Sequence, residues 1–264
     1  MTLLLALSLA ALIGLSLGLL GGGGSILTVP VLVYVLGYGA KAAIAMSLPV
    51  VGITSLMGAA LHWRLGNVRV PTALSFGLLA MLGAFGGAKL AVFISGAVQL
   101  ALLAVVMLAA AASMLRGSRT IPREVSNSAT GAPRLALVVP VALGVGVLTG
   151  LVGIGGGFLV VPALVLLAGV PMRQAVGTSL LVIAMNSASG FVGYLGTVTL
   201  DWGFLARFTS ASVVGAMIGT ALTARVPQAA LKRGFALLLL VMGGFVFYKV
   251  LVPVGTTSSI SAQR

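Results

Sequence analysis

Two glycine clusters are the residues in this chain best suited to bind a ligand. The segments read GLLGGGGSILTVP at residues 18–30 and GLVGIGGGFLVVP at residues 150–162, each within apolar sequence. Consecutive glycines let a membrane helix break, and lipid tolerates broken helices only where they are buried or line a cavity. Freed amides and the positive end of the following helix can hold an anion. We therefore predict a substrate-binding site made of Gly21, Gly22, Gly23, Gly24 and Ser25 with Gly153, Gly155, Gly156 and Gly157.

Close helix packing is the competing interpretation of these glycines. Small residues four apart let two membrane helices approach closely, and this explains the pairs Gly83/Gly87 and Gly215/Gly219 well. It does not explain three or four consecutive glycines followed by a short segment with a proline. Two such interruptions in matching positions of two chain halves are typical of a transporter's substrate site, so we favour the binding interpretation for the clusters.

Polar residues downstream of each cluster extend the predicted site. Ser47, Ser179 and Asn186 can donate hydrogen bonds to anion oxygens, and Asn186 is the costliest of them to bury. Lys41 and Arg173 begin equivalent segments and can draw anions to each entrance. The alternatives are polar contacts between helices for the first three residues and interfacial anchoring for the two cations.

A further group of residues at the end of the third apolar segment is expected to mark the membrane surface. His62, Trp63 and Arg64 stand next to one another there and are typical of an interfacial belt. A proton-carrying role for His62 is the minority interpretation.

The composition restricts the class of protein. Of 264 residues, 60% are hydrophobic and 6% are charged, against about 25% charged in a soluble domain. The chain is therefore expected to be an integral membrane protein with the lipid bilayer as its solvent. Its formal charge of +13 follows from the positive-inside bias and anionic lipids, so no nucleic-acid partner is expected.

The inventory of reactive side chains excludes most catalytic chemistry. There is no cysteine, one histidine, and only two acids, Glu124 and Asp201. We expect no metal site, no catalytic residues, no cofactor and no enzyme activity. The shortage of carboxylates indicates a small anionic or neutral substrate. No phosphate-binding loop motif occurs, so transport would be driven by a gradient.

Ten apolar segments, five in each half, predict an all-α polytopic fold. A full crossing takes about 20 residues, and two segments, 26–36 and 158–168, are too short; each follows a glycine cluster, and whether they cross or re-enter stays open. We divide the chain into a first membrane repeat (1–115), a linker (116–134), a second membrane repeat (135–252) and a tail (253–264). The expected segments are 3–20, 26–36, 42–61, 70–92, 98–115, 135–152, 158–168, 174–195, 202–224 and 231–251.

The two halves are an internal repeat whose copies are predicted to be inverted. A shift of 132 residues takes Gly18 to Gly150 and aligns glycines, a proline, a serine and a basic residue in one register. The loop after the third segment is basic only in the first half, and the loop after the fourth only in the second. Under the positive-inside rule equivalent loops then face opposite sides. This places the linker in the cytoplasm and both termini in the periplasm.

The two glycine motifs, with AIAMS after the first and AVGTS after the second, resemble the TauE/SafE family of sulfite exporters over all of the chain except the linker and tail. The resemblance implies a secondary transporter in the bacterial inner membrane that exports small sulfur-containing anions such as sulfite, sulfoacetate or other organosulfonates. A homodimer is compatible with the sequence. The alternatives are a passive anion channel and a transporter of another small organic anion; an intramembrane enzyme and a purely structural subunit are disfavoured.

Overall fold

The computed structural model describes residues 2–116, 132–152, 157–167, 170–196, 198, 200–223 and 225–251. In these ranges the chain is helical, with turns between the helices, and the all-α prediction is confirmed. Seven described helices are long and apolar enough to cross a membrane. They are α1 (Thr2–Leu20), α3 (Ala40–Arg64), α4 (Val70–Ala91), α5 (Gly96–Arg116), α8 (Met172–Tyr194), α9 (Trp202–Thr223) and α10 (Gln228–Leu251).

The remaining helices include the two short segments that follow the glycine clusters. α2 (Gly23–Pro30) continues as the π-helix η1 (Val31–Val35), and α7 (Gly157–Pro162) continues as η2 (Ala163–Leu167); α6 (Ala132–Val152) precedes α7. The change from α to π directly after each proline has a local cause, because proline lacks an N–H and its ring crowds the carbonyl four residues earlier. The helical run Gly23–Val35 is about 20 Å long, less than the roughly 30 Å apolar core of a bilayer.

The first short segment runs back along α1. Gly24 faces the backbone of Ile13 and Leu17, and further on Val31 and Leu32 join a buried cluster with Ala6 and Ala10 near the start of α1. α1 and α2–η1 therefore form a helical hairpin. The break itself is shorter than expected: Gly21 and Gly22 form the turn, and Gly23, Gly24 and Ser25 are already helical.

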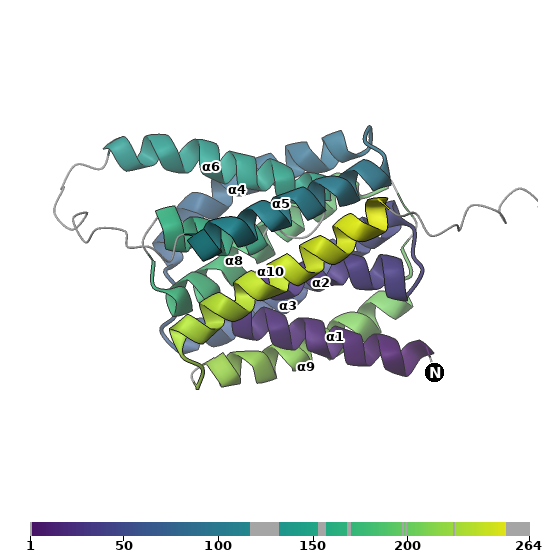
Figure 1. Cartoon of the computed structure of the whole chain (residues 1–264), viewed down its shortest axis with the longest axis horizontal. Helices are drawn as coiled ribbons and strands as arrows, with labels where there is room; N and C mark the ends of the chain where they lie inside the picture. The colour runs from purple at the N-terminus through teal and green to yellow at the C-terminus, as the bar shows by residue number, and fades with distance from the viewer. Residues whose placement is uncertain are drawn as a thin grey trace, which may run out of the picture.

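The helices exchange partners between the two halves of the chain. α9 packs along α1, and α4 packs along α6, while α3 packs on α8 and α5 on α10. In Figure 1, α1 and α9 lie along the lower edge of the bundle, α4 lies with α6 along the upper edge, and α5 and α10 cross the front. The centre of the fold is thus built by α3 and α8, one from each half.

The close contacts between edge helices repeat under the same 132-residue shift. Gly14 and Gly18 on α1 lie against the backbones of Ser212 and Ala216 on α9. Their equivalents on α6, Gly146 and Gly150, lie against the backbones of Ala80 and Ala84 on α4. In both pairs residue numbers rise together, so the paired helices run parallel. Gly83, Gly87, Gly215 and Gly219 also face backbone atoms, as the packing interpretation predicts.

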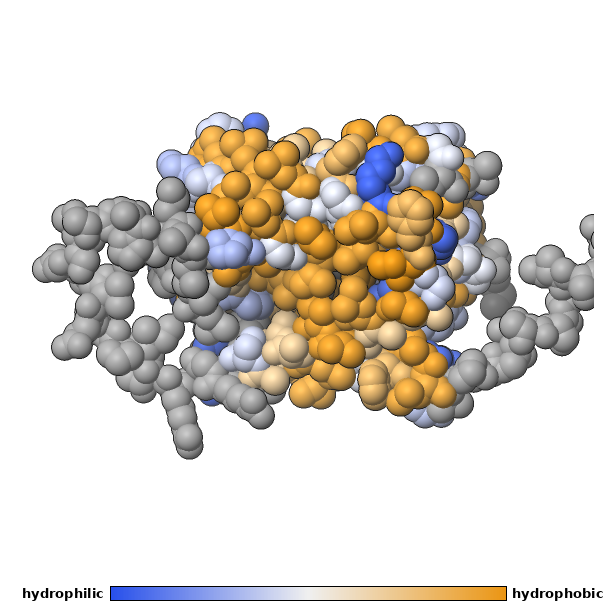
Figure 2. All heavy atoms as spheres, turned by 90° about the horizontal axis from the view of Figure 1, so that it is seen from above, coloured by the Kyte–Doolittle hydropathy of each residue, from blue (hydrophilic) through white to orange (hydrophobic). Residues whose placement is uncertain are grey.

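The surface and the positions of the chain ends suit a bilayer. The start of α1 and the end of α10 lie at one end of the bundle, and the start of α6 lies at the other (Figure 1). Figure 2 shows apolar residues over the middle of the molecule and polar ones toward its two ends. Large apolar side chains are exposed on many helices, among them Leu12, Leu82 and Leu237 at 59%, 69% and 62%. Such a belt is stable against lipid and not against water.

Candidate functional site

The break after α1 depends on a glycine held by the second half of the chain. Gly21 has φ +69°, a conformation that glycine adopts far more readily than other residues. A Cβ on Gly21 would lie 2.8 Å from Ser179 Oγ and 3.1 Å from Val176 Cα, both on α8. A side chain at position 21 is therefore disfavoured for two reasons, the left-handed backbone conformation and the close approach of α8. Of the predicted site residues, Gly21 and Ser179 are brought together.

The end of α1 exposes carbonyl groups that other helices satisfy. His62 Nε2 lies 3.0 Å from the Gly18 carbonyl oxygen, and Thr223 Oγ1 donates to the same oxygen over 3.2 Å. A buried helix end needs such partners, because its last carbonyls have none within the helix. His62 is fully buried while Trp63 is 66% exposed. The expectation that His62 belongs to an interfacial belt is therefore wrong.

The matching residue in the second half makes the matching contact. Tyr194, which the 132-residue shift pairs with His62, places its hydroxyl 3.5 Å from the Leu151 carbonyl oxygen near the end of α6. Both residues stand near the end of the third α-helix of their half. Each half thus supports the end of its own first helix from its own third helix, with a titratable imidazole in one copy and a phenol in the other.

Four buried polar side chains lie where α3 and α8 cross. The helices run antiparallel, because Gly52 lies against Ser187 and Gly58 against Leu180. We define the central polar cluster as Thr54, Ser55, Asn186 and Ser187. Each is at most 1% exposed, and Thr54 Oγ1, Ser55 Oγ, both side-chain amide atoms of Asn186 and Ser187 Oγ have no hydrogen-bond partner.

The two halves contribute equivalent positions to the central polar cluster. The 132-residue shift takes Thr54 to Asn186 and Ser55 to Ser187. Buried polar groups in proteins are nearly always hydrogen-bonded. Leaving one unpaired costs the folded protein about 1–3 kcal/mol of stability. Hydroxyl and amide groups without protein partners are the groups that a polar ligand could engage, which makes the central polar cluster the candidate binding site.

The break after α1 and the central polar cluster share apolar neighbours. Leu17, one turn before the break, packs in one buried cluster with Val51 on α3 and Ile183 on α8. Val51 precedes Thr54 by three residues and Ile183 precedes Asn186 by three, so each lies on the same face of its helix as the polar residue. A movement of α1 at its break would therefore displace the apolar residues that lie next to the central polar cluster.

Several predicted site residues have other roles in the structure. Ser47 and Ser179 donate to the carbonyls of Ile44 and Val176 in their own helix, and Ser25 donates to Gly22. Gly23 is buried beside Leu20 and Leu238, and Gly24 packs on the α1 backbone. Gly22 is the residue before α2. Gly157 is the first residue of α7, and Gly153, Gly155 and Gly156 lie outside the described residues.

The two predicted entrance cations hold helix ends. Lys41 Nζ donates to the carbonyl of Val92, just after α4, over 3.1 Å. Arg173 donates to the carbonyl of Val226, just after α9, over 3.2 Å. Each contact links the start of the third helix of a half to the end of the fourth. Lys41 stands 13 positions before Thr54 on α3, about 20 Å along the helix axis, so it is not part of the central polar cluster.

Polarity and repeat position together could have identified the central cluster from the sequence. Thr54 and Ser55 follow Ser47 in its apolar segment, Ser187 is next to Asn186, and the 132-residue shift pairs all four residues of the cluster. Thr223 and Tyr194 gave no such signal, because their role follows from which carbonyls they meet in space. Among the described residues no group of three histidine, cysteine or acidic side chains could hold a metal ion. The acid Asp201 accepts a hydrogen bond from the Phe204 amide at the start of α9.

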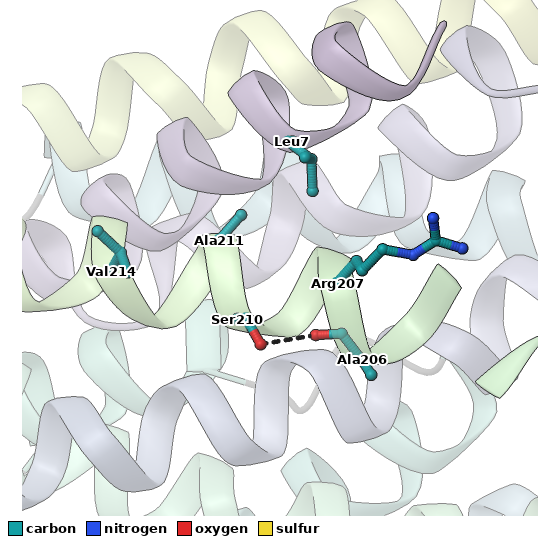
Figure 3. Close-up of a pocket in the computed structure, with 6 residues that line it drawn as sticks. All are labelled: Leu7, Ala206, Arg207, Ser210, Ala211 and Val214. Atoms are coloured by element: carbon teal, nitrogen blue, oxygen red, sulfur yellow. Dashed lines mark hydrogen bonds between the residues drawn. The ribbon is translucent and has the colours of Figure 1, made fainter. Parts of the chain in front are cut away.

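A separate groove lies on the outer surface between α1 and α9. It encloses about 410 Å³, and Figure 3 shows Leu7 of α1 facing Ala206, Arg207, Ser210, Ala211 and Val214 of α9. Its polar atoms are engaged within α9: Ser210 Oγ donates to the Ala206 carbonyl and Arg207 Nε to the Gly203 carbonyl. None of the residues that line this groove belongs to the central polar cluster.

A duplicated helical bundle with an apolar belt, a helix broken at Gly21–Gly22 and a buried polar centre defines a multi-pass membrane protein of the transporter class. The chain belongs to the sulfite exporter TauE/SafE family, whose model matches residues 6–246.

Relatives along almost the whole chain have the same general description. The chain is 32% identical to a probable membrane transporter protein of Xylella fastidiosa, over 94% of this chain and 96% of that protein. It is 28% identical to the probable membrane transporter protein YdhB of Bacillus subtilis, over 86% of this chain and 92% of that protein. No solved structure matches the chain.

Proposed function

We propose that this protein is a secondary transporter that exports small sulfur-containing anions, sulfite or organosulfonates such as sulfoacetate, across the bacterial inner membrane. The linker faces the cytoplasm and both termini face the periplasm. Transport uses an electrochemical gradient, because the sequence carries no phosphate-binding loop motif. The family description, sulfite exporter, supports the substrate class.

The observation that carries this proposal is the unpaired central polar cluster. Its hydroxyl and amide groups can donate several hydrogen bonds to the oxygens of a sulfite or sulfonate group. The described residues put no carboxylate there to repel an anion; Asp201 precedes α9 at a helix end. Neutral donors in a low-dielectric setting bind an anion strongly enough to select it and weakly enough to release it, as a carrier requires.

The transport cycle is proposed to follow from inverted repeats. In its support, α1 runs parallel to α9 and α6 parallel to α4, while α3 and α8 run antiparallel across the centre. A site on the axis between two such halves can be opened to either side by equivalent motions. The break at Gly21–Gly22 lies beyond the cluster toward one end of α3, near His62, so it is suited to gate one side rather than to hold the anion at the centre.

A flux assay tests the proposed function directly. The purified protein is reconstituted into liposomes, and counterflow of sulfite, sulfate, sulfoacetate and taurine is measured. We expect counterflow of sulfite or sulfoacetate, and loss of at least about tenfold in an Asn186→Ala protein, since each lost hydrogen bond to a charged ligand is worth about 1.5–3 kcal/mol. Counterflow that is unchanged in Asn186→Ala contradicts the central polar cluster as the site.

The alternative is a passive anion channel, and the same vesicles separate it from a carrier. A carrier exchanges labelled outside anion for unlabelled inside anion and transiently concentrates the label. A channel lets both equilibrate independently and shows no such overshoot. The closely packed α3–α8 crossing, with Gly52 against Ser187, favours the carrier, because a channel needs a continuous open path.

A further inference from the structure

We propose that His62 is a proton-binding site that couples anion movement to proton movement, with one proton carried alongside each anion, so that export down the anion's own gradient carries a proton outward and an inward proton gradient drives the reverse. This inference rests on the proposed transport function and adds the identity of the coupling ion. It concerns a residue at the break after α1, separate from the central polar cluster.

The hydrogen bond to α1 fixes the protonation pattern of the imidazole. The Gly18 carbonyl can only accept, so the 3.0 Å contact requires a proton on Nε2. In the neutral ring Nδ1 is then a bare acceptor, and it has no partner although the residue is fully buried. A proton added to the Nδ1 lone pair gives an imidazolium without disturbing the bond to Gly18, and loss of the same proton restores the starting state.

Burial opposes a positive charge on the His62 ring, and the end of α1 favours it. His62 lies at the carboxyl end of α1, where the helix dipole is negative. α1 has no ionisable side chain, and α9 contributes the neutral Thr223 to the same carbonyl. α8 contacts His62 through Gly177, and its Arg173 is engaged with Val226. On α3 itself Arg64 is exposed.

The position of His62 connects it to the substrate. Ser55 and His62 are seven residues apart on α3, which places them on one face, about 10 Å apart along the axis. An imidazolium at that distance in a weakly polar interior attracts an anion in the cluster, and by linkage the anion favours protonation of His62. Binding of the proton and binding of the anion therefore favour each other, and the two are carried together.

The second half supplies an internal comparison. Tyr194 occupies the equivalent position and makes the equivalent contact with α6, yet a phenol does not ionise near neutral pH. Histidine is the side chain whose charge changes in that range. A side chain from the third helix thus meets a carbonyl near the end of the first helix in both halves, and only in the first half does that side chain titrate near neutral pH.

The test separates coupling from structure with His62→Gln. The glutamine amide can still donate to Gly18 but cannot take up a proton. Wild-type, His62→Gln and Tyr194→Phe proteins are reconstituted with sulfoacetate, which stays ionised between pH 6 and 8 because carboxylates titrate near pH 4 (about 3.9–4.3). With the membrane potential clamped at zero and the outside one pH unit more acidic, wild-type vesicles should accumulate sulfoacetate up to about tenfold, the limit for one proton per anion.

The three proteins are compared for counterflow and for accumulation of sulfoacetate. His62→Gln should retain counterflow within about threefold of wild type and lose the accumulation, and Tyr194→Phe should accumulate as wild type does. Accumulation by His62→Gln, or none by wild-type vesicles that show counterflow, overturns the coupling role. Absence of wild-type counterflow contradicts the proposed function, and the coupling role fails with it. A dye trapped inside the vesicles should report acidification with sulfoacetate entry in wild type and none in His62→Gln.

Discussion

Ser179 Oγ on α8 lies 2.8 Å from the point at which a Cβ on Gly21 would sit. The break in the first half of the chain is therefore closed by a helix of the second half. Gly21 is also held at φ +69°, so any side chain there meets two penalties, a strained backbone and a steric overlap. This relationship makes the break a joint property of both halves.

Three glycine-to-alanine variants separate the cost of the strained backbone from the cost of the steric overlap. Gly21→Ala carries both and should lower the free energy of unfolding most. Gly37→Ala has the same type of backbone, at φ +76°, with open space around it, and should lose about 1–2 kcal/mol. Gly39→Ala also has open space and no unusual φ, and should stay within about 0.5 kcal/mol of wild type. Thermal unfolding in detergent gives the order; equal effects of Gly21→Ala and Gly37→Ala would exclude the contact with α8 as a constraint.

Gly24 is expected to act through packing rather than through an exposed amide. A Cβ there would overlap backbone atoms of Ile13 and Leu17, so Gly24→Ala should push α2 away from α1. The melting temperature and the flux per inserted protein should then fall together. Gly86→Ala, on α4 with open space around it, is the control. A Gly24→Ala protein of normal stability that has lost flux would instead support the amide site predicted from the sequence.

Asn186→Leu should separate stability from transport. Both amide atoms of Asn186 are buried and unpaired, so replacing it with an apolar residue of similar size removes an unfavourable burial and should leave the melting temperature unchanged or higher. Flux of sulfite or sulfoacetate should fall by about tenfold or more. Thr149→Val is the control, because Thr149 donates to Val145 in its own helix. Loss of stability in Asn186→Leu would show that the amide contacts the protein and not a ligand.

Inverted orientation of the halves is measurable with cysteine labelling, since the sequence has no native cysteine. Trp63 and Leu195 are equivalent under the 132-residue shift and are 66% and 51% exposed. We expect an impermeant maleimide added to intact cells to label Leu195→Cys and to label Trp63→Cys only after the membrane is opened. Labelling of both from the outside would place the two loops on one side and rule out inversion.

Much of the fold was predictable from the sequence, because its signals are local. A helix in lipid requires a long apolar run, and glycine and proline mark where it stops. The segment expected at 3–20 is α1 (Thr2–Leu20), and the one at 202–224 is α9 (Trp202–Thr223). The repeat was visible for the same reason, since each glycine occupies a fixed register position.

The tertiary structure alone decided which faces are buried. Lipid tails are as apolar as a protein core, so polarity along a membrane helix does not reveal its inner face. Composition therefore could not show that His62 is buried against the end of α1, or that Gly24 meets the backbone of α1. The same applies to the central polar cluster: Thr54 and Asn186 are ordinary small polar residues in the sequence, and they become a candidate site because both are buried and unpaired where α3 and α8 cross.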